Sequence, residues 1–215
     1  MLFQNRQDAG RILAQSVAML PNLEDAVVLG LPRGGVPVAF EVARLCKLPL
    51  DILVVRKLGA PGEPELAMGA IASGGAVALN PDILRLLHVP KDTLDAVIAR
   101  EKRKLELQER AYRDQLPALA IEGQTAILVD DGLATGASMR AAVQAVRLRA
   151  RRVVVAVPVG AESTCREFAR EVDWLVCPST PQTFESVGRF YRDFEPTSDD
   201  EVRRLLAEAR GDSGQ

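Results

Sequence analysis

One stretch of the sequence, residues 126–138, constrains the fold more than any other. It begins with four apolar residues, continues with Asp130 and Asp131, and ends in the small-residue segment 132–138. A short run that is apolar at every position suits a strand buried on both faces, as in a parallel sheet. The stretch therefore predicts a strand, a loop and a helix, with two carboxylates at the edge of a parallel sheet where ligands bind.

The rest of the chain repeats this order of strand and helix. Short apolar runs predict strands at 26–30, 51–55, 125–129, 153–157 and 174–177. Apolar residues at helical spacing predict helices at 5–20, 35–46, 136–148, 163–170 and 198–210. Strands that alternate with helices indicate βαβ units, so we predict an α/β fold with a Rossmann-like, mostly parallel sheet flanked by helices.

Three regions depart from this alternation. Two weak strands, 67–72 and 76–79, are separated by small residues that favour a hairpin. Residues 81–122 are dense in charge and carry apolar residues at helical spacing, which predicts a helical insertion with one solvated face. With a terminal segment at 178–210, we expect a single domain over 1–215.

Charge and composition exclude several classes of protein. The chain has 27 Lys and Arg against 29 Asp and Glu, and this net charge of −2 gives no global field for nucleic acid or an anionic membrane. We interpret the basic run 147–152 as a solvated helix end. A hydrophobic content of 47% argues against disorder. The apolar runs are shorter than the ~20 residues that span a bilayer, so no membrane partner is expected.

Cysteine and histidine usage narrows the chemistry. Cys46, Cys165 and Cys177 are odd in number and widely spaced, which predicts buried thiols rather than disulfides or a zinc site. The single histidine, His88, argues against histidine-based metal sites and catalytic triads. The N-terminal residues show no signal-peptide pattern, and we expect a soluble protein in the cytoplasm.

The acids and the loop after them suit different parts of one ligand. Backbone N–H groups of the loop and the helix start can surround a phosphate, with Thr135 and Ser138 as hydroxyl donors. Two carboxylates beside a phosphate suit ribose hydroxyls or a hydrated Mg²⁺. Two alternatives remain: the acidic strand end of a P-loop protein, for which no Walker A sequence exists here, and an ordinary turn capped by aspartate.

The block 129–138 resembles the motif by which type I phosphoribosyltransferases bind phosphoribosyl pyrophosphate (PRPP). The resemblance extends over most of residues 24–190. It implies that Asp130 and Asp131 bind the ribose hydroxyls, with Mg²⁺ held mainly through PRPP and these two acids nearby. The residues implied to bind the 5′-phosphate are Gly132, Leu133, Ala134, Thr135, Gly136, Ala137 and Ser138.

Basic and glycine residues elsewhere match the same family. Arg33 lies in the turn after the first predicted strand, where the family keeps its pyrophosphate loop, and offers two parallel donors for phosphate oxygens. Arg56 and Lys57 stand at the end of the second predicted strand, where related enzymes keep a basic residue. An ordinary glycine turn and a solvated charge pair are the alternatives. The implied pyrophosphate set is Arg33, Gly34, Gly35, Arg56 and Lys57, with catalytic roles for Arg33, Lys57, Asp130 and Asp131.

Two further regions resemble mobile or acceptor-binding parts of the family. The turn-rich segment 58–75 resembles the region that bears the family's mobile catalytic loop, which would close over PRPP and exclude water. The segment 178–210 corresponds to the hood over the acceptor. Its aromatic cluster includes Phe190 and Tyr191, and we expect one of these two rings to face the site. Packing of the rings against the core is the alternative.

One position departs from part of the family. Ala134 stands where hypoxanthine–guanine members carry a third acid, as it does in adenine-type members. A methyl group accepts no proton, so a general base would have to come from elsewhere. Glu63 and Glu65 are the nearest candidates, with exposed loop charges as the alternative.

The resemblance implies an enzyme that transfers ribosyl 5-phosphate from PRPP to a nitrogen base or similar acceptor, releasing pyrophosphate with the help of Mg²⁺. A non-catalytic sensor of PRPP or a nucleotide on the same fold is the alternative. We expect a homodimer with small-molecule ligands and no nucleic-acid partner. The sequence does not identify the acceptor.

Overall fold

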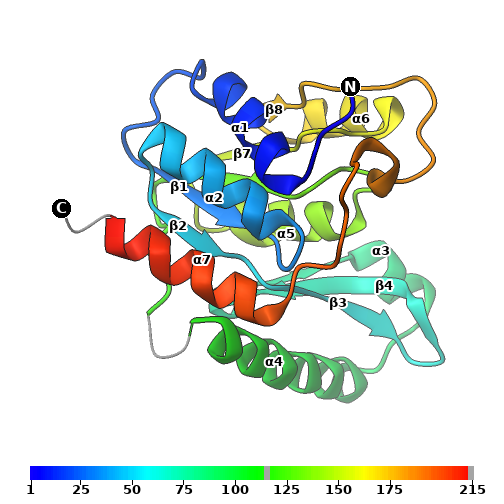
Figure 1. Cartoon of the computed structure of the whole chain (residues 1–215). Coiled ribbons are helices and arrows are strands. Elements are labelled where there is room, and N and C mark those ends of the chain that lie inside the picture. The colour runs from blue at the N-terminus through cyan, green and yellow to red at the C-terminus, as the bar shows by residue number, and fades with distance from the viewer. Residues whose placement is uncertain (114–116, 213–215) are drawn as a thin grey trace.

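The computed structural model describes residues 1–113 and 117–212, and a five-stranded sheet forms its centre (Figure 1). All neighbouring strands in this sheet are parallel, in the order β2-β1-β6-β7-β8. They are β1 (Ala26–Gly30), β2 (Leu50–Ile52), β6 (Thr125–Val129), β7 (Arg152–Ala156) and β8 (Trp174–Val176). The predicted fold class, an α/β protein with a mostly parallel sheet flanked by helices, is confirmed.

Helices cover both faces of this sheet, because successive side chains of a strand point to opposite faces. Val28 and Ile127 pack on one face, against α1 (Arg6–Val17), α2 (Gly35–Cys46) and α7 (Asp199–Asp212). Val27 and Leu128 pack on the other, against α5 (Ala137–Arg147) and α6 (Glu162–Glu171). All five residues of β6 are buried, as its apolar run predicts.

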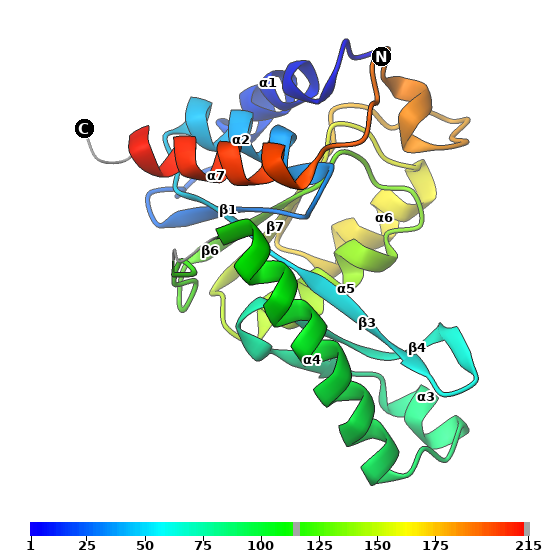
Figure 2. The same ribbon diagram turned by 60° about the horizontal axis from the view of Figure 1, so that its bottom comes forward.

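A second, three-stranded antiparallel sheet projects from the first (Figure 2). It consists of β3 (Val55–Ala60), β4 (Glu63–Ala72) and β5 (Val77–Leu79). The 3₁₀ turn Ser73–Gly75 joins β4 to β5, at the position of the predicted hairpin. Segment 58–75, predicted to be rich in turns with a strand at 67–72, is largely the paired hairpin of β3 and β4.

The prediction of one strand over 51–55 was wrong at its carboxyl end. β2 stops at Ile52, and the chain enters β3 at Val55. Val54 leaves the parallel sheet because Ser73 binds it: the Val54 N–H donates to the Ser73 hydroxyl (2.9 Å), and the Ser73 N–H donates to the Val54 carbonyl (2.9 Å). Arg56 and Lys57 therefore lie on β3 of the antiparallel sheet, rather than at the end of a central strand.

Two helices, α3 (Pro81–Leu86) and α4 (Lys91–Arg113), follow β5 within the range predicted as helical. The apolar face of α4, with Val97 and Leu105, joins the core beside β3 and α7. Residues 114–116, in the same range, lie outside the described part of the chain. Segment 178–198 contains the short 3₁₀ helix η2 (Val187–Phe190) and leads into α7.

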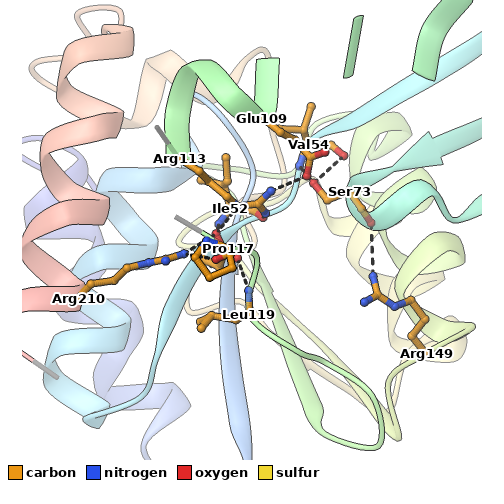
Figure 3. Close-up of polar contacts among 10 residues, drawn as sticks. Ile52, Val54, Ser73, Glu109, Arg113, Pro117, Leu119, Arg149 and Arg210 are labelled. Carbon is orange, nitrogen blue, oxygen red and sulfur yellow. Dashed lines mark hydrogen bonds and ion pairs between the residues drawn. The ribbon is translucent and has the colours of Figure 1, made fainter. Parts of the chain in front are cut away.

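A buried ionic network fixes α4 and α7 to the parallel sheet (Figure 3). The Arg113 guanidinium donates to the Asp51 carboxylate of β2 (2.9 Å) and to the Ile52 carbonyl (2.9 Å). Leu119 donates its N–H to the same carboxylate (2.8 Å), and Arg210 of α7 lies 3.7 Å from it. Asp51 therefore connects the central sheet to α4 and α7.

The three cysteines are free thiols. Cys165 is buried, whereas Cys46 and Cys177 are only half-buried. None of the described helices is both long and apolar enough to cross a membrane.

Candidate active site

The candidate site lies where the strand order of the parallel sheet reverses direction. The chain moves from β1 to β2 on one side, whereas β6 pairs with the other side of β1. Ligands of open α/β sheets bind at the carboxyl ends of two such strands. Here those ends carry loop 31–35 and loop 130–136, and the Leu31 N–H joins them by donating to the Val129 carbonyl (2.9 Å).

Two glycines allow these loops to touch. A Cβ atom at Gly35 would lie 2.6 Å from the Val129 carbonyl oxygen and 2.8 Å from the Asp130 Cα. A Cβ atom at Gly34 would overlap the carboxylate of Asp131. The peptide bond between Pro32 and Arg33 is cis. Only glycine fits at both positions, so the start of α2 lies directly against the acid pair.

The two acids have different surroundings. Asp131 forms an ion pair with Arg6 of α1 (Oδ2 to Nε, 2.9 Å). Asp130 accepts the Asp131 N–H (2.8 Å) and borders a cavity of about 100 Å³ that Gln108 and Ser138 also line. Burial raises the pKa of Asp130, and the Asp131 charge raises it further. Burial also raises the pKa of Asp131, although the Arg6 guanidinium opposes that rise. Asp130 is therefore the acid that faces the cavity.

Arg6 is a site residue that the sequence did not reveal. Besides Asp131, its guanidinium donates to the Glu195 carbonyl (2.7 Å) and lies 4.0 Å from the centre of the Phe194 ring. Arg6 thus joins the first helix, the acid pair and segment 193–195. In the sequence, Arg6 is marked only by its position at the start of a predicted helix, and its partner Asp131 is 125 residues away.

The loop after the acids ends at the N-terminus of α5. Gly136 has a positive φ of 74° and precedes α5, and no side chain caps this helix. The first N–H groups of a helix have no partner within it, so they are available to an anion. Ala134, Thr135, Ala137 and Ser138 are all exposed at this point.

Leu133 differs from the rest of the predicted phosphate loop. Its N–H donates to the Val159 carbonyl (2.9 Å), and its side chain is buried. Its neighbour Gly132 packs under Val187, where a Cβ atom would lie 2.5 Å from a methyl group. The Leu133 N–H therefore holds the loop on the segment after β7, and a phosphate contact of the Leu133 backbone stays a prediction.

The predicted basic residues do not all converge. Arg33, at the start of α2, is half-exposed and lies 3.6 Å from the Asp199 carboxylate. Arg56 donates to Glu101 of α4 (2.8 Å) and to Gln108 (3.4 Å). Of the pyrophosphate set, Gly34 and Gly35 therefore border the acids, whereas the Arg33 guanidinium is directed at Asp199 of α7. Arg56 and Lys57 lie between the β3–β4 hairpin and α4.

The aromatic rings of segment 178–198 pack mainly on one another. Tyr191 is buried between Phe3 and Phe194, with ring centres 5.3 and 5.0 Å away. Its hydroxyl donates to the Asp131 carbonyl (2.6 Å). Phe190 is half-buried and stacks on Phe184 at 5.3 Å. Tyr191 is therefore a support of the acid loop rather than an exposed platform.

We expect Tyr191→Phe and Phe190→Leu to have separable effects. Tyr191→Phe removes one hydrogen bond to the acid loop and should lower the free energy of unfolding by about 1 kcal/mol. Phe190→Leu should raise the KM for an acceptor base more than the KM for PRPP. Chemical denaturation and steady-state kinetics measure the two effects. Unchanged acceptor kinetics with lowered stability in both variants would make both rings purely structural.

The carboxylates of the site suit a metal ion that is bound mainly through the phosphates of a substrate. Among the described residues, no three His, Cys, Asp or Glu side chains converge on one point. Mg²⁺ is usually bound by one or two carboxylates together with substrate phosphates, rather than by an all-protein cage. Asp130 at the cavity supplies such a carboxylate.

The basic run 147–152 is engaged within the protein. Arg147 pairs with Asp173 (3.4 Å), Arg149 with Glu122 (2.7 Å) and Arg151 with Asp25 (2.7 Å). Arg152 lies over the Trp174 ring at 5.3 Å. These partners support the interpretation of a helix end rather than a nucleic-acid surface.

Comparisons with known proteins point to one family. A sequence model described as "Phosphoribosyl transferase domain" matches residues 65–195. The crystal structure of TT1426 from Thermus thermophilus superposes with a TM-score of 0.88. The two proteins are 44% identical over 97% of this chain and 99% of that one.

Two curated proteins are also similar to this chain in sequence. Rv0571c of Mycobacterium tuberculosis, named provisionally as a phosphoribosyl transferase, is 50% identical over 98% of this chain and 48% of its own length. The chain therefore spans about half the length of this relative. The bifunctional protein PyrR of Corynebacterium diphtheriae is 26% identical over 63% of this chain and 74% of its own length.

Proposed function

The chain belongs to the phosphoribosyl transferase family, and we propose that it transfers the ribosyl 5-phosphate group of PRPP to a nitrogen base or a similar acceptor, with release of pyrophosphate. The observation that carries this proposal is the uncapped start of α5 beside Asp130, at the reversal of strand order. A phosphate donor set and a carboxylate within one cavity suit a phosphorylated ribose.

Each part of the site has a role in this proposal. The N–H groups of residues 134–138, with the Thr135 and Ser138 hydroxyls, bind the 5′-phosphate. Asp130 binds the ribose hydroxyls, and Asp131, fixed by Arg6 and Tyr191, keeps the loop in place. Arg33 and the glycine pair beside it bind the pyrophosphate, and Lys57 of β3 is proposed to bind the same group.

Catalysis would consist of positioning and charge stabilisation. As the bond from ribose to pyrophosphate breaks, positive charge develops on the sugar and negative charge on the leaving group. In this proposal, Asp130 stabilises the charge on the sugar and the Arg33 guanidinium stabilises the charge on the leaving group. Mg²⁺, bound through PRPP, would neutralise further charge on the pyrophosphate. Closure of the hairpin would exclude water, which competes with the acceptor.

A pyrophosphate-release assay with PRPP, Mg²⁺ and a panel of purine and pyrimidine bases tests the proposal. We expect release that depends on both PRPP and one of the bases. The same assay on Thr135→Ala/Ser138→Ala should show a raised KM for PRPP. A protein that binds PRPP by calorimetry but releases pyrophosphate with no base would be a sensor instead. Because the exposed side chain of Ala134 supplies no general base, the sensor remains a second candidate function.

We predict that hypoxanthine and guanine are poor acceptors. Ala134 replaces the acid that would contact the purine, and its carbonyl is held by the Thr164 hydroxyl (2.7 Å). Because the Ala134 side chain is exposed, Ala134→Asp should alter PRPP binding by less than about 1.4 kcal/mol, a tenfold change. Nucleotide formation from each purine measures the first effect and calorimetry the second. Efficient transfer to guanine by the unmodified protein would contradict the prediction.

Other proposals concern the general base, location and assembly. Glu63 is exposed near the hairpin turn and remains a candidate base, whereas the side chain of Glu65 lies outside the described part of the chain. A cytoplasmic location and a homodimer remain proposals, and sedimentation analysis would measure the second.

A further inference from the structure

Two of the three cysteines lie against each other in the folded chain. Cys165 is in the first turn of α6, and Cys177 directly follows β8. Both sulfur atoms lie over Gly160: a Cβ atom there would be 2.5 Å from the Cys165 sulfur and 3.4 Å from the Cys177 sulfur. The two thiols are also hydrogen-bonded to each other. The missing side chain of Gly160 therefore leaves the space in which the two sulfur atoms meet.

Backbone hydrogen bonds fix both cysteines beside Gly160. The Gly160 N–H donates to the Ser179 carbonyl (3.1 Å), which joins the segment after β7 to the segment that carries Cys177. The Cys177 sulfur itself lies 3.3 Å from the same carbonyl oxygen. The Cys165 N–H donates to the Ala161 carbonyl (2.9 Å), next to Gly160. The contact between the two thiols is therefore set by the fold.

The surroundings of the pair favour a reactive thiolate at Cys165. The hydrogen bond with Cys177 lowers the pKa of Cys165, against the burial that raises it, and the same bond raises the pKa of Cys177. The first turn of a helix also stabilises a thiolate. Cys165 is only 5% exposed, whereas Cys177 is half-buried, so a small oxidant reaches the pair from the side of Cys177.

We propose that Cys165 and Cys177 form a redox modification site, at which hydrogen peroxide converts the two thiols to a reversible disulfide. The Cys165 thiolate attacks one peroxide oxygen and the O–O bond breaks, which leaves a sulfenic acid at Cys165 and releases water with the proton that Cys165 gave up. The Cys177 sulfur then attacks the Cys165 sulfur. The S–S bond forms, the S–O bond breaks, and the hydroxyl group leaves as water with the Cys177 proton. The two sulfur atoms are oxidised and the peroxide is reduced.

The disulfide would act on the loop after the acids, because α6 holds that loop. The Thr164 hydroxyl donates to the Ala134 carbonyl (2.7 Å), and the Ala161 N–H donates to the Leu133 carbonyl (2.8 Å). A covalent S–S bond is much shorter than a contact between two thiols, so its formation draws the first turn of α6 toward Cys177. Loss of the Thr164 hydrogen bond should then weaken PRPP binding about 2- to 10-fold. This effect rests on the proposed function, whereas the disulfide itself does not.

Peptide mapping by mass spectrometry tests the disulfide in the unmodified protein. After treatment with hydrogen peroxide and alkylation of the remaining thiols, we expect a peptide pair that links Cys165 to Cys177. The link should be absent before oxidation and lost with dithiothreitol. Cys46 is the internal control, because it is half-buried but its sulfur contacts the Ala14 carbonyl (3.7 Å), and it should stay a thiol. A link that involves Cys46, or no link between Cys165 and Cys177, would overturn the proposal.

Calorimetry with PRPP and Mg²⁺ tests the effect on the loop. Affinity should fall when the unmodified protein is oxidised, return with dithiothreitol, and stay constant in peroxide-treated Cys165→Ser. Cys46→Ser is the matched control and should respond like the unmodified protein, with thermal unfolding as the check that each variant is folded. Equal losses in Cys165→Ser, or unchanged affinity in the disulfide-linked protein, would overturn the control of the loop. If neither form binds PRPP, the proposed function fails, while peptide mapping still decides the disulfide.

Discussion

Asp130→Asn is expected to weaken binding of PRPP with Mg²⁺ by about 10- to 150-fold, because a hydrogen bond to a charged group contributes about 1.5–3 kcal/mol. Asp130 is the acid that borders the cavity, and no cation is paired with it among the described residues. The amide keeps the shape of the side chain and loses its charge. Calorimetry on folded protein measures the change, and wild-type affinity in the variant would exclude a role for Asp130 in ribose binding.

The pH dependence of binding separates the two acids. The pKa of Asp130 is raised, so its carboxylate forms at a higher pH than an ordinary aspartate. PRPP affinity should therefore increase with pH as Asp130 loses its proton, and this increase should be absent in Asp130→Asn. Asp131→Asn should instead lower stability, because it leaves the guanidinium of Arg6 without its carboxylate. The double variant should show no measurable PRPP binding.

The sequence predicted the parallel sheet well because each strand has its own local signal. Runs that are wholly or almost wholly apolar, such as 125–129 and 153–157, are buried on both faces and begin and end close to the expected residues. The same signal failed at 51–55, where Ser73 takes Val54 out of the sheet. Apolar side chains do not show where a strand changes partner, since that depends on a residue 19 positions away.

The candidate site was predictable in its loops but not in its supports. The acids, the glycine pair and the start of α5 form two continuous segments, and the fold brings these together. Arg6 and Tyr191 hold Asp131 from opposite ends of the chain, through a guanidinium and a hydroxyl. Neither residue belongs to a local pattern of its own. Contacts of this kind arise only from the folded topology.

Asp51→Ala should lower the free energy of unfolding by about 3–5 kcal/mol, because it breaks a buried ion pair and leaves Arg113 with Glu109 as its remaining carboxylate partner. The side chains of Asp51 and Arg113 are only 2% and 8% exposed. The Asp51 carboxylate also accepts the N–H groups of Ile52 and Leu119, each at 2.8 Å, and both bonds would be lost (Figure 3). Denaturant unfolding measures the change.

Asp25→Ala is the matched control for this variant. Asp25 also pairs with an arginine, Arg151 at 2.7 Å, but both side chains are about half exposed. Exposed pairs contribute about 0–1 kcal/mol, so this variant should unfold almost like the unmodified protein. Equal losses of unfolding free energy in the two variants would show that the buried Asp51 pair stabilises the fold no more than an exposed pair does.

The consequence of Asp51→Ala should extend to the site, because the network holds the helices that reach it. α4 brings Gln108 to the cavity beside Asp130, and the start of α7 brings Asp199 to Arg33. Arg113 and Arg210 tie the carboxyl-terminal ends of these helices to β2 through Asp51. We therefore expect weaker PRPP binding in Asp51→Ala under conditions where the variant is still folded. Unchanged affinity there would mean that the cavity keeps its shape without this anchor.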